Sequence, residues 1–181
     1  NRMGQTKVYA SKDKKVFNPE EQFQKFIEEI KNNSPVVKLP KLPKRNRKCF
    51  FIQVPDLHFG KLGRLSEVGE VYNMEIATQR FMQAIDVFCE DAKRYKPEKI
   101  LVNLGGDILN TDNGKTTTNG APQDEVSSIA DTQRNAVWLI IGGAKELAKY
   151  APVEIIIIPG NHDEIRSWFL GHAIEMYFWN D

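Results

Sequence analysis

Hydrophobic residues fall into three short continuous runs, and longer segments with helical spacing separate these runs. The predicted strands are residues 49–54, 99–104 and 153–158. The predicted helices are residues 70–95, residues 122–149 and a last helix that begins near Ser167. Strands that alternate with helices predict an α/β fold with parallel pairing and right-handed crossovers. Because the strands are apolar throughout, we expect both faces of the sheet to be covered.

The first 47 residues have a different pattern. Asn18 and Pro19 are typical of a helix start, and apolar residues follow at helical spacing. These apolar residues are Phe23, Phe26, Ile27 and Ile30. Residues 36–48 are basic and rich in proline, which is typical of an extended, solvated linker. We therefore predict an N-terminal helix and linker over 1–47 and one partial domain over 48–181.

Composition narrows the class of protein only moderately. The chain is 41% hydrophobic and 27% charged with a net charge of +1, as in ordinary globular domains. Two cysteines, Cys49 and Cys89, form neither a disulfide framework nor a zinc knuckle, so we expect a reducing cytoplasm. No apolar run approaches the roughly 18 residues of a membrane span, so we expect no membrane partner.

Polar residues with metal-binding chemistry follow each predicted strand. Asp56 and His58 follow the first strand, and Asp107 follows the second after two glycines. The third strand leads into Pro-Gly-Asn-His-Asp, residues 159–163. Because parallel strands end at one edge of the sheet, these loops should meet there. Carboxylate, amide and imidazole ligands without a thiolate indicate manganese, iron or zinc at a site that is not structural.

Spacing assigns these residues distinct roles. Asp56 and His58 alternate along an extended chain, so both side chains should point to the same ion. Asp107 has two oxygens that can bridge two ions, and Asn161 can offer a neutral oxygen to the second. His162 is then free to face a substrate. The glycines before Asp107 and Asn161 should allow the backbone to approach closely.

In their order and at their strand ends, these loops resemble the first three motifs of the calcineurin-like metallophosphoesterase superfamily. The stretch from Phe50 to Phe178 is most similar to its DNA-repair exonuclease branch, which includes phage proteins. The resemblance implies the parallel βαβαβα half of a metallophosphoesterase sandwich and two divalent ions, with Mn²⁺ expected. It also implies that Asp56, His58 and Asp107 hold one ion, that Asp107 and Asn161 hold the other, and that His162 is catalytic.

The chain departs from the superfamily in two respects. The later histidine ligands and second set of strands have no counterpart, because only His172 remains and it is expected to be structural or substrate-facing. The chain is therefore expected to be the N-terminal part of a catalytic domain. Asn110 stands where the family places a histidine or aspartate that orients the catalytic histidine. Asp112 or Asp163 could then supply the missing charge beside His162.

The predicted function is metal-dependent hydrolysis of phosphodiesters, by an exonuclease or endonuclease acting on DNA. The ions would polarise the phosphoryl oxygens and lower the pKa of a water, and His162 would protonate the leaving oxygen. Lys61, Lys115 and Thr116 are expected to bind flanking phosphates.

Two alternatives stay open: a phosphatase or phosphodiesterase for small molecules, and an inactive fragment that binds DNA or a partner. An ATPase subunit and a second copy of the chain are the candidate protein partners. The resemblance to phage proteins places the expected cytoplasm in a bacterium or a phage-infected host.

Overall fold

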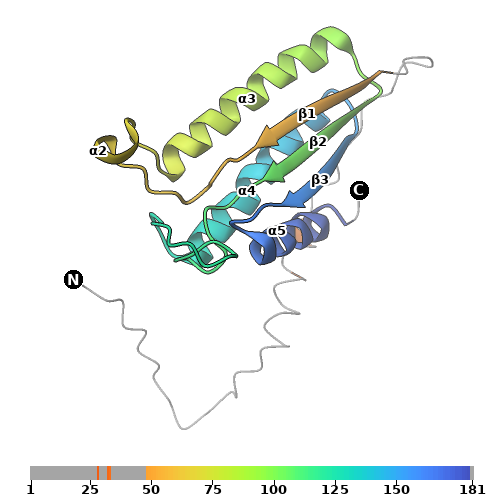
Figure 1. Cartoon of the computed structure of the whole chain (residues 1–181). Helices are drawn as coiled ribbons and strands as arrows, with labels where there is room; N and C mark the ends of the chain where they lie inside the picture. The colour runs from red at the N-terminus through yellow and green to blue at the C-terminus, as the bar shows by residue number, and fades with distance from the viewer. Residues whose placement is uncertain (1–27, 29–31, 34–47, 180–181) are drawn as a thin grey trace.

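The computed structural model describes residues 28, 32–33 and 48–179. Its core is a parallel sheet with strand order β1-β2-β3 (Figure 1). The strands are β1 (Cys49–Pro55), β2 (Lys99–Gly106) and β3 (Val153–Pro159). The helices are α2 (Leu65–Val68), α3 (Met74–Tyr95), α4 (Ile129–Ala148) and α5 (Glu164–Tyr177). The predicted α/β class with parallel strands is confirmed, whereas the predicted N-terminal helix and linker lie almost entirely outside the described residues.

One face of the sheet carries the hydrophobic core. Ile52, Val102 and Ile155 are paired across the three strands and point to this face. Helix α3 contributes a stripe at helical spacing, namely Ala77, Phe81, Ile85, Cys89 and Ala92. This apolar stripe fixes the helix against the sheet and α4.

The opposite face of the sheet is exposed in the described part of the chain. Phe51, Ile156 and Ile158 lie on this face and are 55%, 39% and 50% exposed. Asn103 Nδ2 donates to Gln53 Oε1 at 2.6 Å on the same face. The expectation that both faces are covered is therefore wrong for the described residues, because a continuous apolar strand does not identify what covers it.

Three helix starts differ from the prediction. Helix α3 begins at Met74 rather than at residue 70, because Asn73 Oδ1 accepts from Ile76 N and caps it there. Helix α4 begins at Ile129 rather than at Pro122, because Ser128 Oγ accepts from Asp131 N and caps it there. Pro122 instead pairs with Thr116 in an isolated bridge of the preceding loop. Helix α5 begins at Glu164 rather than near Ser167.

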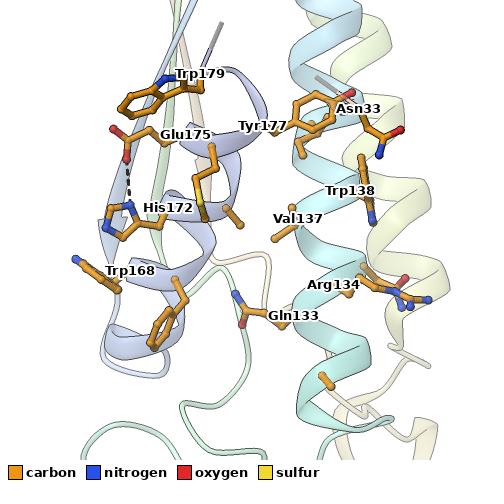
Figure 2. A pocket seen from close by; sticks show the side chains of 16 residues that line it. Asn33, Gln133, Arg134, Val137, Trp138, Trp168, His172, Glu175, Tyr177 and Trp179 are labelled. Atoms are coloured by element: carbon orange, nitrogen blue, oxygen red, sulfur yellow. Dashed lines mark hydrogen bonds and ion pairs between the residues drawn. The ribbon is translucent and has the colours of Figure 1, made fainter. Parts of the chain in front are cut away.

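Helices α4 and α5 border an apolar groove that the strands do not fill (Figure 2). Trp138 lines it from α4, and Trp168, Phe169 and Met176 line it from α5. Among the described helices, none has the length and hydrophobicity needed to cross a membrane.

Candidate metal centre

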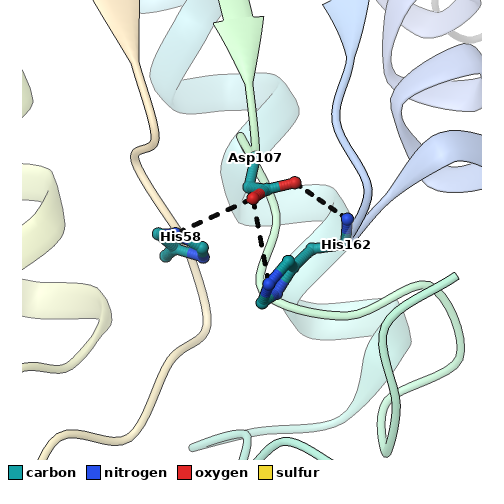
Figure 3. A group of neighbouring side chains, drawn as sticks. All are labelled: His58, Asp107 and His162. Atoms are coloured by element: carbon teal, nitrogen blue, oxygen red, sulfur yellow. Dashed lines mark hydrogen bonds and ion pairs between the residues drawn. The ribbon is translucent and has the colours of Figure 1, made fainter. Parts of the chain in front are cut away.

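Three predicted residues meet at the carboxyl edge of the sheet. His58 lies in the loop after β1, Asp107 directly follows β2, and His162 follows β3 (Figure 3). One ligand atom from each lies within 4.8 Å of the others. Asp107 Oδ2 is 4.0 Å from His58 Nε2 and 3.8 Å from His162 Nε2. The sheet topology thus converts three distant sequence positions into one cluster.

The loop after β1 is held by an unusual backbone conformation. Asp56 and His58 have φ angles of 48° and 45°, so the chain turns sharply on leaving the strand. The extended alternation expected for these two residues is therefore wrong. Asp56 Oδ1 accepts from Asp107 N at 3.2 Å, and His58 N donates to Asp107 O at 2.8 Å. The loop after β1 consequently fixes the backbone that presents Asp107.

Two glycines make the close approach of these loops sterically possible. A Cβ at Gly106, where φ is +72°, would lie 2.3 Å from Asp56 Oδ1. A Cβ at Gly160 would lie 2.0 Å from Asp107 Oδ1. The prediction that these positions need glycine for a close approach is confirmed.

His162 is oriented by two hydrogen bonds. Its backbone N donates to Asp107 Oδ1 at 2.8 Å, and its Nδ1 lies 2.9 Å from the carbonyl oxygen of Asn110. Because a carbonyl oxygen can only accept, Nδ1 must carry the hydrogen. In the neutral ring, the lone pair is then on Nε2, the nitrogen nearest Asp107 Oδ2.

His58 also has the properties of a metal ligand. Burial lowers its pKa, and the nearby His162 lowers it further. The neutral ring, which can donate a lone pair to a cation, is favoured as a result. His58 Nδ1 is buried without a hydrogen-bond partner in the described part of the chain. One carboxylate and two imidazoles, with Nε2 of His58 and of His162 nearest Asp107 Oδ2, fit a divalent transition metal.

Asn110 and Asp163 form hydrogen bonds with the residues and loops of the cluster. The side chain of Asn110 is fully buried, and its Nδ2 donates to Asp124 O at 3.1 Å. The contact with His162 is made by the backbone carbonyl oxygen of Asn110. Asp163 Oδ2 accepts from Leu109 N at 2.6 Å, and its Oδ1 accepts from Gly160 N at 3.1 Å. Burial raises the pKa of the Asp163 carboxyl although these hydrogen bonds oppose the shift. Asp163 therefore connects the loops after β2 and β3.

Asp112 has a different place from the one expected. Its Oδ1 accepts from Ile165 N and Arg166 N, each at 3.0 Å, so it binds the first turn of α5. Its Oδ2 accepts from Thr118 Oγ1 at 3.0 Å. These contacts anchor the loop after β2 to α5 instead of placing a charge beside His162.

The second predicted ion would involve Asn161, which is exposed at the same edge. The backbone carbonyl of Asn161 accepts from Thr118 N at 3.1 Å, which fixes its main chain. Its assignment as a ligand stays a prediction, as does the second ion itself.

The predicted phosphate-binding residues fall into two groups. Lys61 is half-buried and its charge contributes to lowering the pKa of His58, so it lies near the cluster. Lys115 N and Thr116 N both donate to Asn113 Oδ1, which places these residues in a turn of the loop after β2. His172 lies within α5, where its Nδ1 is 3.1 Å from Glu175 Oε2.

A buried ion pair behind the site was not predicted. Arg166 Nη1 donates to Glu125 Oε1 at 2.9 Å, and these side chains are 5% and 2% exposed. The same guanidinium donates to Thr111 O at 2.8 Å and Gln133 Oε1 at 3.1 Å. Glu125 belongs to a polar loop that resembles any solvated segment, so the sequence holds no signal of its burial.

The fold and the site define a parallel α/β protein with a His-Asp-His cluster at the carboxyl edge of its sheet. No family model matches the chain, and neither a curated protein nor a solved structure matches it. The metallophosphoesterase resemblance therefore stays a prediction based on the motifs alone.

Proposed function

We propose that this chain is the metal-binding part of a metal-dependent phosphoesterase. The observation that carries the proposal is the convergence of His58, Asp107 and His162 within 4.8 Å at the carboxyl edge of a parallel sheet. In sheets of this kind, that edge is where ligands bind. The motif resemblance adds the reaction class, hydrolysis of phosphate esters, and the substrate class, DNA.

The roles of the residues follow from their contacts. Asp107 Oδ1 already accepts from His162 N, so Oδ2 is the oxygen directed to a cation. His58 and His162 would supply the nitrogen ligands through Nε2, so a general acid would have to come from another group. When bound, the ion would supply Lewis acidity toward a phosphoryl oxygen. Lys61 adds positive charge beside His58, where the phosphate of a substrate would lie.

The expected ion is Mn²⁺, and the resemblance predicts a second ion shared by Asp107 and Asn161. This second ion should bind more weakly, because fewer groups of the chain serve it. Calorimetric titration with Mn²⁺ checks the order of binding. Two equally tight sites would contradict this part of the proposal.

One experiment tests the metal site. The Asp107→Asn variant should lose more than about 100-fold in Mn²⁺ affinity. That loss exceeds the loss of affinity usual for a residue that only supports a ligand. Asp86→Asn, an exposed carboxylate on α3, is the matched control and should bind like the parent. A parent chain that takes up no divalent ion, or an Asp107→Asn variant with parental affinity, refutes the site.

A second experiment tests the substrate. Hydrolysis of linear DNA is compared with hydrolysis of a chromogenic phosphodiester in the presence of Mn²⁺. DNA binding should weaken steeply as salt concentration rises, because phosphate contacts release counterions. Hydrolysis of the small ester alone supports the small-molecule alternative, and metal binding without any hydrolysis supports a non-enzymatic module.

A further inference from the structure

A wide apolar groove lies between α4 and α5. It has a volume of about 1330 Å³. Trp138 on α4 is 51% exposed, and Trp168 and Phe169 on α5 are 57% and 56% exposed. Soluble domains seldom leave so much contiguous aromatic surface open to water, so an occupant is indicated. The groove is formed by the two helices and lies apart from the His58–Asp107–His162 cluster.

A residue from the beginning of the chain already lies in this groove. Asn33 is one of its lining residues, beside Trp138 and Tyr177 (Figure 2). Asn33 precedes the proline-rich run 36–48, whereas the other lining residues belong to the C-terminal third of the chain. The groove and the N-terminal segment are therefore adjacent in space.

Glu28 and Asn32 are the described residues that precede Asn33. Glu28 and Asn32 are both helical and both exposed, and residues four apart lie on the same side of a helix. At roughly 100° per residue, Phe26 and Ile30 lie about 160° and 200° around the axis from Glu28. Since Glu28 and Asn32 face solvent, the sequence places the apolar stripe on the opposite side.

We propose that residues 19–33 dock as an amphipathic helix in the groove between α4 and α5 of the same chain. The stripe of Phe23, Phe26, Ile27 and Ile30 supplies the apolar side chains that the groove would accept. Residues 34–47 can span about 45 Å when extended, which allows the return to β1. The helix is too short to be stable in water alone, so its formation depends on docking.

Hydrogen exchange of the full chain, measured by mass spectrometry at low micromolar concentration, tests the proposal. Amides of residues 22–32 should exchange at least about tenfold more slowly in the parent than in a Phe26→Asp variant. Ala173→Glu, which places a charge in the groove from α5, should accelerate the same amides. Two control variants should retain the protection of residues 22–32. They are Glu28→Gln, at an exposed position, and Val87→Glu, on the exposed side of α3.

The amides of β2 report whether each variant remains folded, and Phe26→Ala replaces Phe26→Asp if they lose protection. Fast exchange of residues 22–32 in the parent overturns the proposal. Protection that requires high concentration and a dimer in sedimentation shows that a second copy fills the groove, which also overturns it. Protection that is independent of concentration and lost in both Phe26→Asp and Ala173→Glu supports docking within one chain.

Discussion

Replacing Asp163 by alanine should separate the two loops that present the metal-centre residues. The side chain is fully buried, and each oxygen accepts one backbone hydrogen bond. Leu109 N binds Oδ2 at 2.6 Å, and Gly160 N binds Oδ1 at 3.1 Å. Leu109 follows Asp107 by two residues, and Gly160 precedes His162 by two. One carboxylate therefore sets the relative position of both loops.

The structure gives the expected magnitude. A buried N–H left without an acceptor costs about 1–3 kcal/mol, which applies in full to Leu109 N. Gly160 N is part-buried and should lose less, because water can partly replace the acceptor. Burial raises the pKa of the Asp163 carboxyl, which means that desolvation already offsets part of this gain. We therefore expect Asp163→Ala to lower the free energy of unfolding by about 2–4 kcal/mol. Asp163→Asn keeps one acceptor oxygen and should cost about 1–3 kcal/mol.

Urea unfolding followed by circular dichroism measures these differences. Asp86→Ala, on the exposed side of α3, is the control and should leave the free energy of unfolding unchanged. The hydrogen-bond argument is refuted if Asp163→Ala is as stable as the parent. If Asp163→Asn is as stable as the parent while Asp163→Ala is not, one of the two hydrogen bonds contributes nothing.

Two further predictions concern a thiol and a glycine. Burial raises the pKa of the Cys89 thiol, so at pH 8 it holds less reactive thiolate and should be alkylated at least about tenfold more slowly than exposed Cys49. Mass spectrometry follows both sites, and equal rates in the folded chain would contradict the burial of Cys89. Gly160→Ala should weaken Mn²⁺ binding, because its Cβ would lie 2.0 Å from Asp107 Oδ1. Gly142→Ala, whose Cβ would meet nothing within 4 Å, is the control, and equal calorimetric affinities would refute the steric argument.

The sheet was predictable because apolar runs bounded by polar residues locate strands directly. The predicted strands 49–54, 99–104 and 153–158 differ from the observed ones by one or two residues at their ends. The start of α4 could not be predicted, because Pro122 and Ser128 are both acceptable helix starts. The choice between them depends on the bridge of Pro122 to Thr116, which is a contact within the folded loop.

The candidate site was predictable in part of its membership but not in its geometry. His162 was expected to be catalytic and not a ligand, and Asp56, expected to be a ligand, is not one of the three clustered residues. The position of polar residues after parallel strands placed His58, Asp107 and His162 at one edge. It could not indicate the positive φ angles of Asp56 and His58, because these depend on hydrogen bonds to the neighbouring loop. Nor could it show that Asn110 contacts His162 through its carbonyl group, since side-chain chemistry says nothing of backbone groups.

The hydrogen bond between His162 and Asn110 bears on the chemistry that His162 can perform. With Nδ1–H bound to a carbonyl, Nε2 is the atom that can meet a cation or hold a proton, and it cannot do both at once. A carbonyl that accepts from the far nitrogen is the usual support of a metal-bound histidine. Nε2 is also 3.8 Å from Asp107 Oδ2, close enough for both atoms to bind one ion. The geometry therefore favours His162 as a ligand in the metal-loaded state, and a general acid would then have to come from another group.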